Sequence, residues 1–194
     1  MPTKKTDNGN LREKLFLRRH FIEKYHRPGP FAVIDACAGS GVIWQTLRRQ
    51  YDCSYWPLDV KPARGRLAVD SVRVLAQAGW KADIVDIDTY GSPWKHWLAM
   101  LPNAPLPLTV FVTIGSVKIN GVAFTDLTQQ KLAGLSFKTL RLPAALAGKL
   151  GDFLVSSCLT SSYDYGIIIT EALECPAPGN ARYIGLRLEQ GKRT

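Results

Sequence analysis

The run Val33-Ile34-Asp35-Ala36-Cys37-Ala38-Gly39-Ser40-Gly41 joins an apolar stretch that ends in an acid to a turn of small residues. The apolar run 31–34 is typical of a buried parallel strand, and 42–49 has the pattern of a helix. Glycine is needed where backbone adopts positive φ or approaches a ligand closely. A dinucleotide site would carry a third glycine where this chain has Trp44, which argues against NAD. The turn is therefore a candidate ligand-binding loop. The alternative is an ordinary turn between strand and helix, in which Asp35 binds backbone amides.

Outward from this turn, apolar patterns that suit strands alternate with patterns that suit helices. The predicted helices are 11–25, 42–49, 72–78, 94–101 and 144–159, and the predicted strands are 31–34, 54–58, 82–87, 108–114, 165–171 and 181–188. Pro176, Pro178, Gly179 and Asn180 separate the last two strands, as in a hairpin. The alternation predicts an α/β fold with about seven strands, mostly parallel, helices on both faces and a C-terminal antiparallel hairpin.

The crossover between the second and third strands is short. Only ten residues separate Asp59 from Asp70, whereas a parallel crossover usually takes a dozen or more. A strand at 67–69 is therefore expected to be vestigial or absent, or residues 66–78 form one helix.

Length and composition favour one compact domain. The 194 residues are 46% hydrophobic and 21% charged, which excludes a disordered or fibrous chain. We expect a disordered basic tail over 1–10 and one domain over 11–194. No apolar run approaches the roughly 20 residues of a membrane span, and no leader-like segment opens the chain, so no membrane association and a cytoplasmic location are predicted. The four cysteines and three histidines lack metal-ligand spacing, so no metal is expected and the histidines are predicted to face solvent.

Positive charge is concentrated near the N-terminus. Of the net +9, residues 1–27 carry +5, from eight Lys and Arg against three acids, and the other 167 residues carry +4. Lys and Arg neutralise phosphates in non-specific nucleic-acid binding, so the basic helix within 11–27 suggests a polyanionic partner. A solvated basic helix face is the alternative. Arg18 and Arg19 are the candidate phosphate contacts.

The acid-x-x-x-Gly-x-Gly form of residues 35–41 resembles motif I of the class I S-adenosylmethionine (SAM) methyltransferases. The resemblance implies SAM as cofactor, with Asp35 helping to hold its aminoacyl end. Cys37 stands where many members of that family have glycine. Asp59 ends the second strand, where an acid can accept both ribose hydroxyls, as in dinucleotide folds; a solvated loop carboxylate is the alternative. Asp70 stands where the family often contacts the adenine amine, and an aspartate that caps a helix explains it equally well. The turn residues expected to bind the cofactor are Asp35, Cys37, Gly39 and Gly41.

A second stretch, 82–93, reads Ala-Asp-Ile-Val-Asp-Ile-Asp-Thr-Tyr-Gly-Ser-Pro and ends the fourth strand. A conjugated exocyclic amine is a poor nucleophile, so its site must orient the nitrogen and support the developing positive charge. Asp88 and the carbonyl of Thr89 can accept both N–H groups, and Tyr90 can stack on a flipped base. The alternative is a set of acids along a sheet edge, which is costly to bury without partners. The remaining loop residues expected to shape the acceptor site are Gly91 and Pro93.

This stretch resembles the Asp-Pro-Tyr-Gly-Ser-Pro motif of the tRNA guanine-N2 dimethyltransferase family. The resemblance implies Asp88 as the amine acceptor and Tyr90 as the stacking platform, and Thr89 replaces the family's proline. It covers roughly 31–121; the family's further aspartate after the fifth strand is missing from 113–121, and nothing matches its long C-terminal domain. The expected function is SAM-dependent methylation of a nucleobase exocyclic amine, with RNA favoured over DNA. The alternatives are a DNA, small-amine or protein methyltransferase and a non-catalytic nucleic-acid-binding module; the oligomeric state stays open.

Overall fold

The computed structural model describes residues 10–61, 67–89, 91–114, 144–175 and 181–191. Most of the expected tail, Tyr90, the residues after Ile114 where a further aspartate was sought, and the turn of the hairpin lie outside these ranges. Within them, no helix is long and apolar enough to cross a membrane.

One mixed sheet organises the described chain. Its strands are β1 (Phe31–Asp35), β2 (Cys53–Asp59), β3 (Leu67–Ala68), β4 (Ile84–Ile87), β5 (Leu108–Ile114), β6 (Ile167–Cys175) and β7 (Arg182–Gln190). They lie in the order β3-β2-β1-β4-β5-β7-β6, with β7 antiparallel to both of its neighbours and the other pairs parallel. The mostly parallel sheet and the antiparallel C-terminal hairpin are confirmed. β3 is the expected vestigial strand, with only two residues beside six longer strands.

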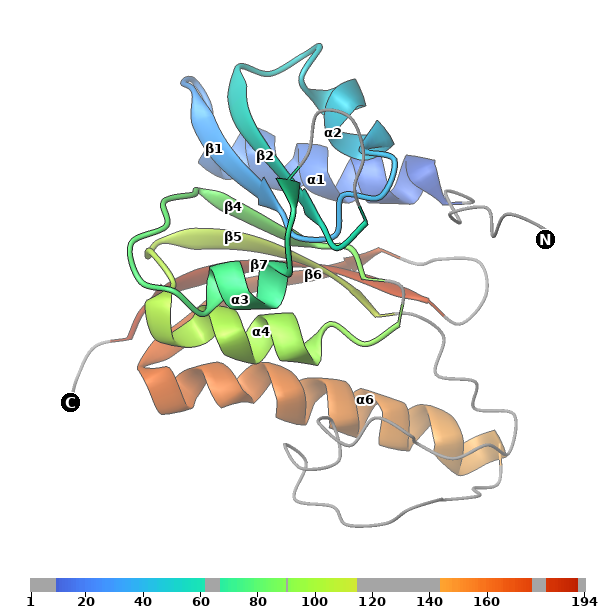
Figure 1. Cartoon of the computed structure of the whole chain (residues 1–194). Coiled ribbons are helices and arrows are strands. Elements are labelled where there is room, and N and C mark those ends of the chain that lie inside the picture. Colours follow the sequence, from blue (N-terminus) through green and yellow to red (C-terminus); the bar gives the residue numbers. More distant parts are fainter. Residues whose placement is uncertain (1–9, 62–66, 90, 115–143, 176–180, 192–194) are drawn as a thin grey trace.

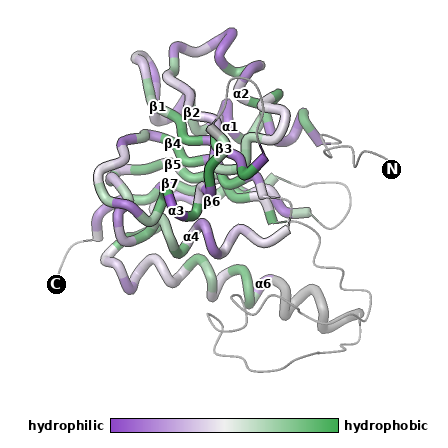
Figure 2. Tube along the Cα trace, viewed as in Figure 1, coloured by the Kyte–Doolittle hydropathy of each residue, from purple (hydrophilic) through white to green (hydrophobic). Residues whose placement is uncertain are grey.

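The helices cover both faces of the sheet. They are α1 (Leu11–Tyr25), α2 (Val42–Leu47), α3 (Ser71–Leu75), α4 (Trp94–Met100) and α6 (Ala144–Thr160), with 3₁₀ helices η1 (Leu101–Asn103) and η2 (Ser161–Tyr165). Helices α1 and α2 lie on one face, and α3, α4 and α6 lie on the other (Figure 1). The parallel central strands are buried on both faces, so they form the apolar band through the middle of the molecule (Figure 2).

A separate apolar core fills each side of the sheet. Phe21 of α1 and Trp44 of α2 are fully buried on one side, and Trp94 and Trp97 of α4 on the other. Gly185 of β7 lets α1 approach closely, because a Cβ at that position would lie 2.5 Å from the Phe21 ring. Helix α1 is therefore packed into the core rather than merely attached to its surface.

The expected boundaries hold closely for α1, α6 and β5, whereas α3 ends at Leu75 rather than at residue 78 and β4 begins at Ile84 rather than at residue 82. The largest difference is in β6. The sequence pattern suggested a strand over 165–171, whereas β6 begins at Ile167 and continues to Cys175. Residues Ser161–Tyr165 form a 3₁₀ helix that ends at Gly166, whose φ of 68° turns the chain into the strand.

Candidate functional site

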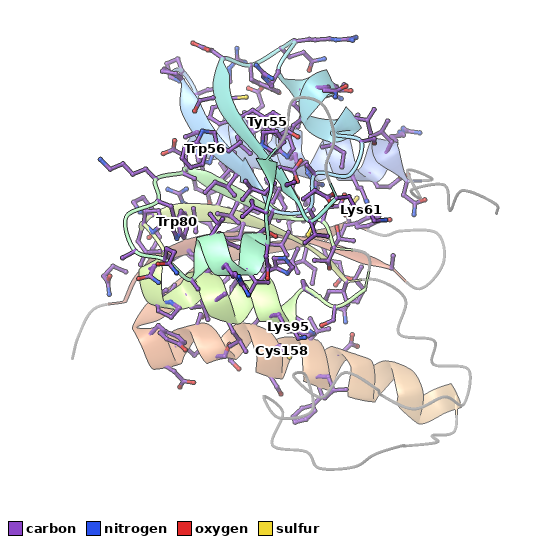
Figure 3. All side chains as sticks on the ribbon, viewed as in Figure 1. Tyr55, Trp56, Lys61, Trp80, Lys95 and Cys158 are labelled. Atoms are coloured by element: carbon purple, nitrogen blue, oxygen red, sulfur yellow. The ribbon has the colours of Figure 1, made fainter. Side chains whose placement is uncertain are left out.

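The turn after β1 lies at the carboxyl edge of the sheet. Gly39 and Gly41 have φ angles of 52° and 70°, in the left-handed region that favours glycine. A Cβ on Gly41 would also lie 3.2 Å from the Tyr55 hydroxyl. That hydroxyl, on β2 (Figure 3), donates a 2.9 Å hydrogen bond to Oδ2 of Asp35. The two glycines thus let the backbone fold tightly over the acid that ends β1.

Asp35 is buried among other charged groups. Burial raises its pKa well above the usual value, the negative charge of Asp86 raises it further, and the Tyr55 hydrogen bond opposes the shift. Asp35 and Asp86 are direct neighbours in the β1–β4 register, and the Ala36 amide donates to the Asp86 carbonyl at 2.8 Å. Burial and the charge of Asp86 therefore disfavour the charged form of Asp35, whereas the Tyr55 hydrogen bond and the positive charge of Arg18 favour it.

Asp59 ends β2 and reaches across to the same turn. Its Oδ2 accepts a 3.0 Å hydrogen bond from the Gly39 amide, and its Oδ1 accepts one from the Lys61 amide at 2.9 Å. These two backbone bonds orient the Asp59 carboxylate at the turn.

Asp70 is the N-cap of α3. Its Oδ1 accepts from the Val72 amide at 3.0 Å, and its side chain is half exposed. The capping interpretation is therefore confirmed, whereas contact with a cofactor stays a prediction.

His96 of α4 joins the turn to α3, although the sequence had placed it in solvent. Its Nε2 lies 3.0 Å from Oγ of Ser71 and 3.7 Å from Sγ of Cys37. Its Nδ1 is buried and has no hydrogen-bond partner among the described residues. Burial lowers the pKa of His96, and burial together with nearby acids raises the pKa of Cys37 to about 12, so the imidazole and the thiol are both neutral at pH 7.

Asp88 lies just beyond β4 and holds an amine. Lys14 Nζ donates to Oδ1 and to Oδ2, each at 2.8 Å. The Lys14 side chain is 7% exposed and that of Asp88 is 17% exposed. The charges of Asp35, Asp88 and Asp59 all act on Cys37, so the three acids surround one region at the carboxyl edge.

Asp86, two residues earlier, has a different environment. Its carboxylate accepts from Arg18 Nε at 2.7 Å, from Arg18 Nη2 at 2.6 Å and from Trp44 Nε1 at 2.7 Å. Arg18 and Asp86 are each 1% exposed. The expected phosphate contact is therefore wrong for Arg18, because its guanidinium is enclosed by the carboxylate that it neutralises. Arg19 is partly exposed, with a buried Nε that lacks a hydrogen-bond partner in the described chain, and its phosphate contact stays a prediction.

The loop after Asp88 is tied to the neighbouring strand. The Thr89 hydroxyl donates to the carbonyl of Thr113 at 3.2 Å. Threonine thus anchors the loop through its side chain, at the position where the family motif has proline. Gly91 adopts φ of 129°, and Pro93 is buried at the start of α4. The role of Tyr90 stays a prediction, because this residue lies outside the described ranges.

Sequence reasoning missed the contributions of Lys14 and His96, and it missed that Arg18 forms a buried ion pair. A signal for the two cations was present: the apolar stripe of Leu17, Phe21 and Ile22 on α1 continues at helical spacing through them, and the acids of β4 required partners. His26 is also half-buried rather than solvent-facing, with Nε2 2.9 Å from Oγ1 of Thr109. Such burial has no local sequence signal.

Two other kinds of site, a cavity and a metal-binding cluster, do not lie at this edge of the described structure. A cavity of about 230 Å³ lies at the opposite, amino edge of the sheet, between the Arg27–Phe31 turn and the residues before β2. Within the described ranges, no cluster of three His, Cys, Asp or Glu side chains could hold a metal ion.

No family model matches the sequence, and no curated protein matches it either. Solved structures do match. Trm1 from Pyrococcus horikoshii in complex with S-adenosyl-L-methionine has a TM-score of 0.67 at 15% identity, over 93% of this chain and 55% of that one. This chain thus spans about half the length of Trm1.

Two further matches cover most of both chains. The N-methyltransferase NodS from Bradyrhizobium japonicum has a TM-score of 0.51 at 12% identity, over 95% of this chain and 99% of that one. The 1,6-didemethyltoxoflavin-N1-methyltransferase from Burkholderia thailandensis, with its substrate and S-adenosylhomocysteine bound, has a TM-score of 0.53 at 11% identity, over 95% and 80%. Together with the strand order, these matches show that the chain has the class I fold of SAM-dependent methyltransferases.

Proposed function

We propose that the protein transfers a methyl group from SAM to an exocyclic amine of a nucleobase in RNA. One observation carries this proposal: Asp88, at the carboxyl edge beside the glycine turn, holds an amine nitrogen with both carboxylate oxygens. An acceptor amine needs the same pair of hydrogen-bond acceptors. No other described acid of β4 offers them, because Asp86 is enclosed and Asp83 binds the Ala32 amide at the opposite end of the strand.

The residues at the turn fit SAM. Two backbone bonds orient the Asp59 carboxylate at the end of β2, and a carboxylate can accept from two neighbouring hydroxyls, as ribose requires. The turn is open at Gly39, since a Cβ there would meet only the Cys37 carbonyl, at 3.9 Å. Asp35, whose pKa is raised by burial, would ionise when a cationic aminoacyl group lies near. When bound, the cofactor supplies an electrophilic methyl group on a positively charged sulfur.

On the acceptor side, Asp88 orients the amine and stabilises its developing positive charge. The Thr89 carbonyl is the second proposed acceptor, and the hydroxyl bond of Thr89 to β5 limits movement of that loop. Tyr90 is proposed to stack on the base. Each role needs a preorganised group rather than a covalent intermediate.

Exposed cations at the same edge support a nucleic acid as substrate. Arg12 precedes Lys14 by two residues, Lys61 follows Asp59 by two, and Lys95 adjoins His96. Figure 3 shows Lys61 beyond the end of β2 and Lys95 in the first turn of α4. RNA is favoured because the Asp88 loop resembles the tRNA guanine-N2 dimethyltransferase motif. Methylation of DNA, of a protein or of a small amine remains an outcome of the test.

The test is transfer of labelled methyl from SAM to total RNA and, separately, to DNA. We expect RNA labelling by the wild type and a loss of at least ~100-fold in Asp88→Asn, the scale of removing one preorganised charge-stabilising group. Asp164→Asn is the matched control, because Asp164 is exposed in η2 and precedes β6, at the amino edge. Equal labelling by wild type and Asp88→Asn would remove Asp88 from the mechanism, and absence of SAM binding by calorimetry would favour the non-catalytic module.

A further inference from the structure

The amine that Asp88 holds belongs to the protein itself. Lys14 Nζ lies 2.8 Å from each carboxylate oxygen, at the place that the proposed function gives to the acceptor amine. The ring of Tyr183 lies beside it, 5.1 Å from Nζ to the centroid. An amine, a carboxylate and an aromatic ring therefore meet at the carboxyl edge before any substrate arrives.

Further hydrogen bonds fix the backbone of Lys14 and the ring of Tyr183. Lys14 is on the inward side of α1, one turn before Arg18, whose Nη1 donates to the Lys14 carbonyl at 3.0 Å. The Asn10 side chain donates to the Tyr183 hydroxyl at 2.9 Å, which orients the ring. With only 7% of its side chain exposed, Lys14 has lost most of the freedom of a surface lysine.

We infer that Lys14 is a methylation site of the protein itself, with SAM as the donor. This inference rests on the proposed function, because it uses the same cofactor and the same Asp88. In the reaction, the Lys14 ammonium first loses a proton to solvent. The neutral nitrogen then forms a bond to the methyl carbon while the carbon–sulfur bond breaks and its electron pair stays on sulfur. The products are methyl-lysine and S-adenosylhomocysteine; the proton already released completes the balance.

Charged and polar groups surround Nζ. They are Asp88 beyond β4 and Tyr183 of β7, with Arg18 of α1 and Asp86 of β4 one turn deeper. Only the neutral amine has a lone pair, so the ammonium that Asp88 holds must lose its proton before the methyl group is transferred.

Three other lysines of the described chain serve as internal references. Lys81 and Lys95 are exposed, and Lys24 pairs with Glu171 on the outer side of α1. Because positioning of the two reacting atoms dominates such reactions, methyl should appear on Lys14 at least ~100-fold above Lys81 or Lys95.

The experiment incubates purified protein with SAM alone and locates methyl groups by peptide mass spectrometry. Wild type, Lys14→Arg and Asp88→Asn are compared, with SAM binding checked in each by thermal shift. A second readout needs no SAM: an amine-acylating reagent should label Lys14 at least ~10-fold more slowly than Lys95, and Asp88→Asn should remove that protection.

The expected result is methyl on Lys14 in the wild type, none on the corresponding peptide of Lys14→Arg, and a large loss in Asp88→Asn. SAM binding without methyl on Lys14, or methyl spread equally over exposed lysines, would overturn the inference while leaving the proposed function intact. Absence of SAM binding would overturn both. Fast acylation of Lys14 in the wild type would show that Asp88 does not hold the amine, and would also overturn the inference.

Discussion

Asp86 and Asp88 are separated by one residue, and they have different roles because their surroundings differ. Asp86 accepts three hydrogen bonds from Arg18 and Trp44 and is 1% exposed, so nothing else can reach it. Asp88 accepts from the Lys14 ammonium, and its own side chain remains 17% exposed. The first carboxylate therefore anchors α1 to the sheet, and the second is available to a ligand.

The Arg18–Asp86 pair gives a stability prediction. Arg18→Met leaves a buried carboxylate without its counter-ion, which typically costs about 3–5 kcal/mol. Adding Asp86→Asn removes that charge and should restore part of the loss. Urea unfolding measures both variants, with the exposed Arg48→Met expected to stay within ~0.5 kcal/mol of the wild type. An Arg18→Met protein as stable as wild type would contradict the anchoring role.

The burial of His26 predicts that the folded state loses stability in acid. Burial, with the positive charge of Arg187, lowers its pKa to about 4, against about 6.5 in the unfolded chain. The unfolded state therefore binds the proton more readily, so this stability is present above about pH 6.5 and is lost as pH falls towards 4. We expect a contribution of about 1–2 kcal/mol, allowing for partial exposure of the ring. Urea unfolding across this range should show a shallower pH slope in His26→Gln, and an unchanged slope would reject the assignment.

Side chains of α1 pair in register with side chains at the end of β4, because residues on one face are spaced by similar distances along the helix and along the strand. Residues four apart on a helix rise about 6 Å, and residues two apart on a strand rise about 6.6 Å. Lys14 and Arg18 thus face Asp88 and Asp86 in register. Two cations of the helix that was expected to bind nucleic acid therefore pair with aspartates of the protein itself.

Docking of α1 also depends on β7. Gly185→Ala would place a Cβ 2.5 Å from the Phe21 ring, so α1 must shift or the ring must leave its rotamer. Overpacking of this kind typically costs about 1–3 kcal/mol, and the shift would also weaken the Lys14–Asp88 contact. Thermal unfolding tests the change. Gly29→Ala is the control, since its Cβ would meet no atom within 4 Å, and equal stability of the two variants would contradict the close packing.

For the whole molecule, SAM should stabilise the folded state. At a concentration about 100 times its Kd, a ligand adds about 2.7 kcal/mol, which corresponds to roughly 5–10 °C in Tm for a chain of this length. Asp59→Ala should reduce that shift strongly. Asp52→Ala is the matched control, because Asp52 precedes the same strand at its other end and is exposed. Equal shifts in both variants would exclude Asp59 from the cofactor site.

Much of the fold was predictable because its signals are local. The spacing of apolar residues indicated α1 and β5 to the residue, since burial periodicity is a property of each segment. The boundaries of β6 were less accurate, because the 3₁₀ helix before it has no distinct pattern. Asp59 and the glycine turn were found from type and spacing, whereas His96 was not, since a lone histidine carries no sign of its burial.

The amino-acid order by itself determined that β1 and β2 end in an acid and that glycine permits a left-handed turn after β1, since both depend on neighbouring residues. Only the tertiary structure decided which acids are neutralised. Lys14 and Asp88 are 74 positions apart, and Arg18 and Asp86 are 68 apart. Pairing of charges depends on distance in space, and that distance exists only after α1 has packed on the sheet.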